Sequence, residues 1–161
     1  VVVTDYSAKG ISAMVQNAQT MGLSQSLSAL CHDVREPLPF PDESFDACYS
    51  HMLYCMALTT PELECLSREM WRVLKPGGIN VYSVRNTSDP DYGKGLNVGD
   101  HTYQVSGYTI HFFDRAMVER LSVGYEILSA EEFEEGDMPK RLYLVSLRKR
   151  VESGNCRGNV T

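Results

Sequence analysis

Residues 38–80 constrain the fold of this chain more than any other stretch. They open with Leu-Pro-Phe-Pro-Asp-Glu-Ser-Phe-Asp, whose prolines keep the backbone extended, and lead into an apolar run at 45–49. Apolar residues at helical spacing follow over 61–75, and Gly77 or Gly78 can cap that helix before a second apolar run at 79–84. This pattern predicts a strand–helix–strand crossover, the repeating unit of an open α/β sheet.

The same alternation of strand-like runs and helical stripes continues on both sides of the crossover. In chain order we predict a strand at 1–5, a helix over 7–22, a strand at 27–34, a helix over 114–124 and two final strands at 125–133 and 142–148. The first run, Val-Val-Val-Thr-Asp, has no polar alternation, which predicts a strand buried on both faces. An acidic turn, Glu131 to Asp137, is predicted between the last two strands.

Residues 86–109 interrupt this alternation. Asn, Asp, Gly, Tyr and His dominate there and aliphatic residues are few, so we predict a long irregular cap, too long for a neutral connector and therefore a functional candidate. The polar residues 151–161 are predicted to be a disordered tail. The chain is thus predicted to be one α/β domain over residues 1–150, with its cap at 86–109.

Composition and charge exclude several functional classes. The net charge of −6 over 161 residues disfavours a nucleic-acid footprint and an anionic membrane surface, which both require basic faces. No apolar run approaches the length of a membrane span, and no secretory signal pattern is visible. The five cysteines include no C-x-x-C pair, which favours reduced thiols and a cytoplasmic location.

A metal site is not predicted. His51 and Cys55 stand four residues apart, a spacing that could place two ligands on one helical face, but no clear third ligand accompanies them.

Three segments resemble class I S-adenosylmethionine-dependent methyltransferases, most closely the small-molecule (type 11) branch. They are Leu-Pro-Phe-Pro-Asp-Glu-Ser-Phe-Asp at 38–46, Arg-Glu-Met-Trp-Arg-Val-Leu-Lys-Pro-Gly-Gly at 68–78 and the aromatic return His111-Phe112-Phe113. The resemblance runs from Val1 to about Arg148. It implies a Rossmann-like, doubly wound, mostly parallel sheet with strands in the order 3-2-1-4-5-7-6 and the seventh antiparallel.

The resemblance implies S-adenosyl-L-methionine as the cofactor and assigns residues to it. Residues 1–5 resemble strand two, so Asp5 matches the acid that holds the ribose hydroxyls, because a carboxylate can accept from both hydroxyls at once. Tyr6 matches the residue that lies on the adenine ring. Asp33 matches the acid that accepts from the adenine amino group, with Val34 beside it. Ser50 and His51, after strand four, match the residues around the methionine part.

One departure from the family is large. Strand one and its glycine-rich turn have no counterpart, although that turn holds the methionine end of the cofactor by close backbone approach. Without strand one, strands two and four would face a gap of about 10 Å, with unpaired backbone on both sides. We therefore expect the sequence to be an N-terminally truncated piece of the enzyme. A homo-oligomer or a borrowed strand that fills the gap is the other expectation.

The expected function is methyl transfer to a small molecule, with His51 as the general base because imidazole titrates near neutrality. The ending Ser-His-Met-Leu at 50–53 lacks the Asp/Asn-Pro-Pro-aromatic pattern of nucleic-acid amino methylases. The expected substrate-facing residues come from the cap and its borders: Arg85, Tyr92, His101, Tyr103 and His111. Two alternatives stay open. One is a non-catalytic, methyltransferase-shaped interaction domain, and the other is a different Rossmann-type enzyme that binds a nucleotide through Asp5.

Overall fold

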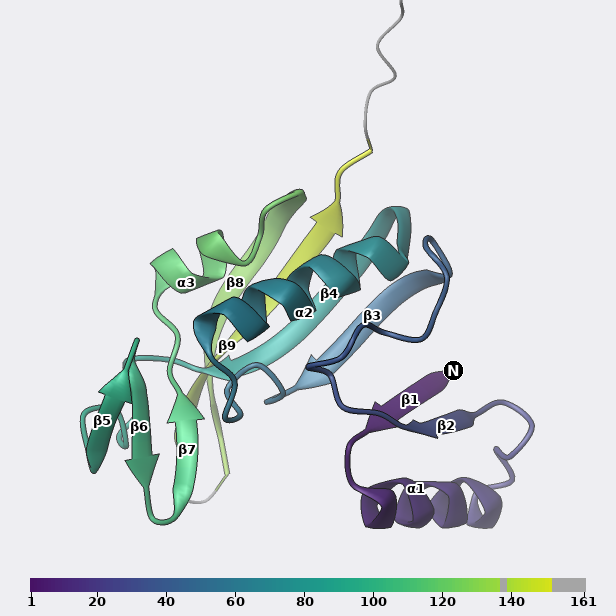
Figure 1. Ribbon diagram of the computed structural model, residues 1–161, viewed down its shortest axis with the longest axis horizontal. Helices are drawn as coiled ribbons and strands as arrows, with labels where there is room; N and C mark the ends of the chain where they lie inside the picture. The colour runs from purple at the N-terminus through teal and green to yellow at the C-terminus, as the bar shows by residue number, and fades with distance from the viewer. Residues whose placement is uncertain (137–138, 152–161) are drawn as a thin grey trace, which may run out of the picture. The chain divides into compact units, whose positions relative to one another are not determined.

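The computed structural model describes residues 1–136 and 139–151. Its contacts divide the chain into two compact units (Figure 1), one of residues Val1–Leu38 and one that begins at Pro39. The prediction of one domain over residues 1–150 is not tested by this division. The two units are described separately below.

The first unit is a βαβ element. β1 (Val2–Asp5) leads into α1 (Ala8–Thr20), and the chain returns as β2 (Ser28–Cys31), parallel to β1. Ser7 caps α1 as predicted, because its hydroxyl accepts the Gly10 N–H at 3.2 Å. The sequence therefore located all three elements, within a few residues at their ends.

The prediction that β1 is buried on both faces is wrong. No residue of β1 is fully buried, and Val2 is 40% exposed. A parallel strand is buried on both faces only within a wider sheet that helices cover on each side. In this unit β1 has one neighbouring strand and one helix.

The second unit is built on a four-stranded sheet in the order β3-β4-β9-β8. Its strands are β3 (Phe45–His51), β4 (Leu74–Arg85), β8 (Tyr125–Glu135) and β9 (Lys140–Lys149). β3 is parallel to β4, and β9 is antiparallel to both β4 and β8. This order confirms the predicted arrangement of strands four, five, seven and six, with the seventh antiparallel.

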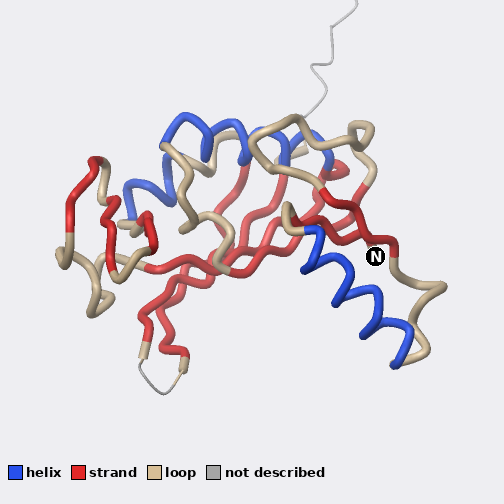
Figure 2. Tube along the Cα trace, turned by 60° about the horizontal axis from the view of Figure 1, so that its bottom comes forward, coloured by secondary structure: helices blue, strands red, loops and turns tan. Residues whose placement is uncertain are grey.

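Two helices lie on one face of this sheet (Figure 2) and close its core. α2 (Thr60–Val73) begins with a reciprocal capping box, in which Thr59 accepts the Glu62 N–H and Glu62 accepts the Thr59 N–H. α3 (Arg115–Arg120) is capped by Asp114, as predicted. The second unit has a core of fully buried side chains, which include Leu63, Leu66, Val73, Leu74, Val84, Phe113, Val118, Leu142, Val145 and Leu147.

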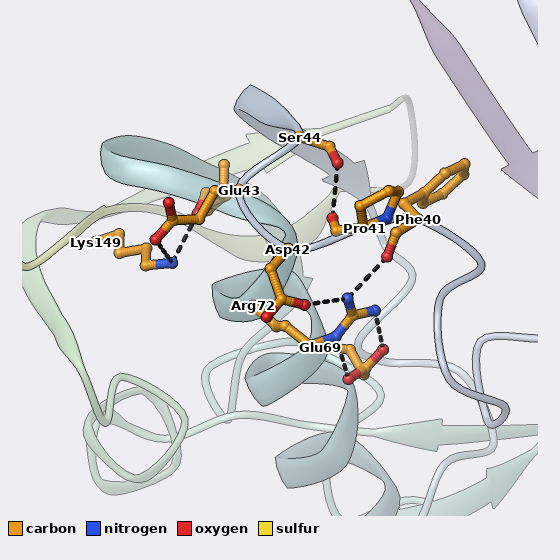
Figure 3. A network of polar contacts seen from close by, with 9 residues as sticks. Phe40, Pro41, Asp42, Glu43, Ser44, Glu69, Arg72 and Lys149 are labelled. Atoms are coloured by element: carbon orange, nitrogen blue, oxygen red, sulfur yellow. Dashed lines mark hydrogen bonds and ion pairs between the residues drawn. The ribbon is translucent and has the colours of Figure 1, made fainter.

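The proline-rich turn is held to α2 by a polar network (Figure 3). The Arg72 guanidinium donates to the Phe40 carbonyl and to Asp42, both at 2.8 Å, and also pairs with Glu69 on its own helix. The neighbouring residue, Trp71, donates its indole N–H to the Gly124 carbonyl at 3.2 Å, and the Lys149 ammonium lies 3.9 Å from the indole ring centre. These contacts fix the proline-rich turn, the start of β8 and the end of β9 to one helix.

Two local predictions within this unit are wrong. α2 ends at Val73, and β4 starts directly at Leu74, which pairs with Phe45, so neither Gly77 nor Gly78 caps the helix. Residues 131–135 belong to β8 rather than to a turn, because Glu134 and Glu135 pair across the hairpin with Arg141 and Lys140. Asp137, the last residue of the predicted acidic turn, lies outside the described residues, and so do residues 152–161 of the predicted tail.

The predicted irregular cap contains an antiparallel meander instead. β5 (Leu96–Gly99), β6 (Thr102–Val105) and β7 (Tyr108–His111) form a separate three-stranded sheet. Each strand is only four residues long and glycines separate them, so no run shows the alternation that marks a strand. The cap therefore has regular structure of its own, formed by antiparallel pairing of these short strands.

Gly95 supplies the first prediction. A Cβ at Gly95 would come within 2.0 Å of the Gln104 carbonyl oxygen, and its φ of +77° is strained for other residues. Gly95→Ala is expected to separate β5 from β6, seen as faster amide exchange across the meander. The matched control is Gly93→Ala, where φ is +79° but nothing lies within 4 Å of the added carbon, so only about 1 kcal/mol of backbone strain is expected. Equal effects of the two variants would contradict the close approach.

Candidate methyltransferase site

Asp5 stands at the carboxyl end of β1, directly before α1. Its Oδ1 accepts the Ser7 N–H at 2.7 Å, which orients the carboxylate. A Cβ at Gly10 would lie 3.2 Å from Oδ2, so this glycine leaves space beside the second oxygen. Among the described residues, the Ser7 amide is the hydrogen-bond donor to this carboxylate. The arrangement fits a ligand that presents hydroxyl groups to Oδ2.

The other residues predicted to hold the adenosine part differ in exposure and in their hydrogen-bond partners. Tyr6 is 74% exposed, and its carbonyl accepts from the Cys31 thiol. Hydrogen bonds from the Arg35 side chain and amide hold the pKa of Asp33 at about 2. This carboxylate is therefore ionised but shared with a guanidinium, which occupies part of its acceptor capacity. Val34 lies in the turn that follows.

His51 lies at the carboxyl end of β3 in the second unit, between two polar partners. Its Nδ1 is 2.6 Å from the Ser83 hydroxyl on β4, directly across the parallel pair. Its Nε2 is 3.4 Å from the Glu135 carboxylate, at the end of β8. The His51 and Glu135 side chains are 43% and 40% exposed, so the imidazole can reach both a solute and its partners.

The contact with Ser83 is compatible with a His51 tautomer in which Nδ1 carries the hydrogen. The Ser83 hydroxyl oxygen already accepts the Met52 N–H at 3.3 Å, and its second lone pair can accept from Nδ1–H. When Nδ1 donates in this way, Nε2 carries the lone pair and is free to take a proton. The Glu135 carboxylate then faces this nitrogen at 3.4 Å. Ser50, next to His51, is buried, and its hydroxyl has no partner among the described residues.

Arg85 is held in an ion-pair network. Its Nε donates to Asp89 at 2.9 Å, its Nη2 donates to both Asp89 and Asp91, and the guanidinium lies over the Phe112 ring. The Asp89 side chain is 0% exposed and the Arg85 side chain 7%. This geometry ties the start of the cap to the sheet, and the predicted contact of Arg85 with substrate stays a prediction.

Three more of the residues predicted to face substrate form one aromatic cluster. The Tyr92 hydroxyl lies 2.7 Å from Nδ1 of His101, and its ring packs edge-on against Tyr103 and Phe112. Nε2 of His101 lies 3.6 Å from Asp114, the cap of α3. The structure thus brings Tyr92, His101 and Tyr103 together. His111, the fifth predicted residue, is buried at the end of β7.

Sequence reasoning missed Ser83 and Glu135. Ser83 lies within the predicted strand 79–84, and only the register of β3 against β4 places it opposite His51. Glu135 was assigned to an acidic turn. The signal that could have found it is the facing pair of basic residues at 140–141, which indicates a longer hairpin.

Within residues 1–136 and 139–151, no group of three or more His, Cys, Asp or Glu side chains is placed to hold a metal ion. In the same described ranges, no helix has the length and apolar character needed to cross a membrane.

Comparison of the sequence with known families finds one match, over residues 1–78, to the family described as "Methyltransferase domain". Among curated proteins, the chain is similar to a sterol 24-C-methyltransferase of Pneumocystis carinii, with 29% identity over 135 residues. That alignment covers 78% of this chain and 33% of the relative. The chain spans about a third or less of the length of the curated relatives it matches.

Solved structures share the fold. A SAM-dependent methyltransferase from Methanosarcina mazei superimposes with a TM-score of 0.82 at 17% identity, over 94% of this chain and 82% of that one. The 1,6-didemethyltoxoflavin-N1-methyltransferase of Burkholderia thailandensis, solved with its substrate and S-adenosylhomocysteine bound, gives 0.70 at 13% identity. That match covers 94% of this chain and 61% of the other. Together with the family match over residues 1–78, these likenesses confirm the predicted resemblance to class I S-adenosylmethionine-dependent methyltransferases, and the chain shares their fold.

Proposed function

We propose that this chain forms the core of an enzyme that transfers a methyl group from S-adenosylmethionine to a small molecule. The observation that carries the proposal is the Asp5 carboxylate at the end of β1, oriented by Ser7 and open at Oδ2 beside Gly10. It lies within the part of the chain that matches a methyltransferase domain. Asp5, Tyr6, Asp33 and Val34 would hold the adenosine part, and Ser50 and His51 the methionine part.

When bound, S-adenosylmethionine supplies a methyl group that is already activated on a sulfonium. The residues of the chain then have to position the acceptor and take its proton. The proton that the acceptor loses on methylation would pass to Nε2 of His51. Ser83 accepts a hydrogen bond from Nδ1–H, and Glu135 stabilises the imidazolium that results.

The acceptor is proposed to be a small molecule. The net charge of −6 disfavours nucleic acid, and the relatives named above act on a sterol and on a toxoflavin precursor. Every cysteine within the described residues is a free thiol, which favours the predicted cytoplasmic location. A homo-oligomer or a complementing strand at the open edges stays a prediction.

Binding of S-adenosylhomocysteine tests the proposal. Asp5→Asn keeps an acceptor for the Ser7 N–H but removes the charge, so we expect affinity to fall about 10- to 150-fold, the range for hydrogen bonds to a charged group. The measurement is isothermal titration with the full protein that carries this sequence. Glu36→Gln, which removes an exposed carboxylate of the same unit, is the control and should leave affinity unchanged.

The alternatives predict other results in the same titration. A non-catalytic domain would bind no S-adenosylhomocysteine. A different Rossmann-type enzyme would prefer another nucleotide, such as NAD, with the same dependence on Asp5. Either outcome would replace the proposed function.

A further inference from the structure

β5 is an open edge strand of the meander, within the second unit. The strand order β5-β6-β7 gives β5 one neighbouring strand, and Figure 1 shows it at the outer side of the meander. Its residues, Leu-Asn-Val-Gly, are all exposed, and they include no charged residue and no proline, with which proteins usually protect such an edge. An unprotected edge of this kind can pair with a further strand.

The register of β5 against β6 directs the backbone of Asn97 toward this open edge. Leu96 pairs with Gln104, and the Gln104 carbonyl points toward β5, because a Cβ at Gly95 would come within 2.0 Å of its oxygen. Neighbouring residues of an antiparallel strand direct their N–H and C=O groups to opposite sides. The N–H and C=O of Leu96 therefore face β6, and those of Asn97 face outward.

The sequence around Asn97 is complementary to itself when two copies run in opposite directions. Residues 94–100 read Lys-Gly-Leu-Asn-Val-Gly-Asp. An antiparallel pair centred on Asn97 places Leu96 of each copy opposite Val98 of the other. It also brings Lys94 of each copy to Asp100 of the other, so unlike charges meet at both ends. A parallel pair would instead place like charges side by side.

The side chains that would meet are accessible. Leu96 and Val98 are 62% and 49% exposed, so each still has apolar surface to cover. The Lys94 side chain is 63% exposed, and its ammonium lies 3.8 Å from Asp91. Asp100 is exposed, and one oxygen of its carboxylate accepts the Thr60 hydroxyl at 3.0 Å. These intramolecular contacts are open to solvent and leave both charges able to attract a second partner.

We propose that two copies of this chain pair through β5, antiparallel and centred on Asn97, so that their two meanders form one continuous sheet. Each Asn97 donates its N–H to the Asn97 carbonyl of the other copy. Leu96 and Val98 cover each other across the pair, and Lys94 with Asp100 sets its direction. The contact is the same for both copies and therefore closes at a dimer.

This edge is distinct from the edges that strand one of the family would pair with, and it uses no residue assigned to the cofactor or to His51. The dimer therefore does not rest on the proposed function. Titration of the same variants with S-adenosylhomocysteine should give the wild-type affinity, so loss of the dimer and failure of the proposed function can be distinguished.

Exchange of the two charges tests the pairing. In the full protein that carries this sequence, Lys94→Glu sets carboxylates against each other at both ends, and Asp100→Lys does the same with ammonium groups. Each variant alone is expected to dimerise about tenfold more weakly than wild type, or less still. An equimolar mixture of the two restores unlike charges at both ends and should dimerise like wild type. Sedimentation equilibrium measures all four samples.

A backbone substitution tests the centre of the pair. Asn97→Pro removes the outward N–H without removing a donor to β6, so it should weaken the dimer about 10- to 100-fold, the effect of two lost hydrogen bonds. Asn97→Thr is the matched control. It loses the side-chain bond to the Gly99 N–H at 2.8 Å but keeps the outward N–H, and it should dimerise like wild type.

The amide resonance of Asn97 locates the contact. In the 15N-labelled full protein it should shift as the concentration rises to about 1 mM, where even a weak dimer forms. A protein that stays monomeric at this concentration would overturn the proposal, and so would a dimer that forms without moving this resonance. A dimer that survives Asn97→Pro, or a mixture of the two charge variants that stays monomeric, would also contradict it.

Discussion

Replacing Asp89 by alanine is expected to lower the free energy of unfolding of the second unit by about 3–5 kcal/mol, the usual effect of removing one partner of a buried ion pair. The Asp89 carboxylate accepts from the Arg85 guanidinium and from the backbone amides of Asp91 and Arg141, the last two at 2.9 Å. Alanine leaves the buried guanidinium with Asp91 alone and leaves two amides unpaired. Urea unfolding at neutral pH measures the change.

Asp91→Ala is the matched control. Asp91 also pairs with Arg85, but its side chain is 38% exposed. An ion pair open to solvent contributes about 1 kcal/mol or less, so this variant should unfold close to the wild type. Equal losses for Asp89→Ala and Asp91→Ala would show that burial does not set the strength of this network.

The same network predicts a dependence on pH. Burial by itself raises the pKa of Asp89, but hydrogen bonds from Arg85 and from two amides outweigh it and the net pKa is lowered. A carboxyl whose pKa is lower in the folded state stabilises fully above its unfolded value, about 3.9, and this stabilisation is lost as the pH falls through the folded value. The stability difference between wild type and Asp89→Asn should therefore shrink below about pH 4. A difference that does not change with pH would count against the ionised pair.

The second large effect is expected at His51. His51→Gln should lower the rate of methyl transfer by about 10²- to 10⁴-fold, the usual contribution of a positioned general base, in an enzyme whose acceptor loses a proton. S-adenosylhomocysteine affinity should change much less than the rate, because glutamine can still form hydrogen bonds at the end of β3. Single-turnover rates of wild type and variant are the measurement.

Variants of Ser83 and Glu135 are the controls for the role of His51 as general base. Ser83→Ala removes the partner of Nδ1 and Glu135→Gln removes the facing charge, so each should lower the rate less than His51→Gln. Tyr49→Phe changes a residue of the same strand that is 70% exposed and should have no effect. Wild-type rates in His51→Gln would remove the general-base role while leaving cofactor binding intact.

The sheet was predictable because its strands and helices carry strong periodic patterns. The stripe of α2 and the run at 79–84 bury side chains, and this requirement is visible in the order of residues, whereas the apolar run at 45–49 lies in a strand but contains no fully buried residue. The meander in the cap was not predictable, because four-residue strands between glycines bury too little to leave a pattern. The meander is held by pairing of β5 with β6 and of β6 with β7.

The candidate site divides in the same way. His51 could be located because the end of an apolar, strand-like run is recognisable, but its partners depend on register and on a hairpin longer than expected. From the sequence, Arg85 can be predicted as a positively charged residue between the strand at 79–84 and the cap at 86–109. The sequence does not reveal that Asp89, four residues later, turns back to bind Arg85. Side chains that act through pairing across the sheet are therefore the part that a single sequence leaves out.

The position of Trp71 has a practical consequence. It is the only tryptophan in the chain, and its indole is bonded to the Gly124 carbonyl and faced by the Lys149 ammonium. Both groups leave the indole when α2 separates from the sheet, so intrinsic fluorescence reports the melting of the second unit. Residues 1–38 contain no tryptophan and so do not contribute to the tryptophan fluorescence. Circular dichroism, in contrast, also detects the helix α1 of that unit. Comparing the two signals in one melt therefore tells whether the two units unfold together or in sequence.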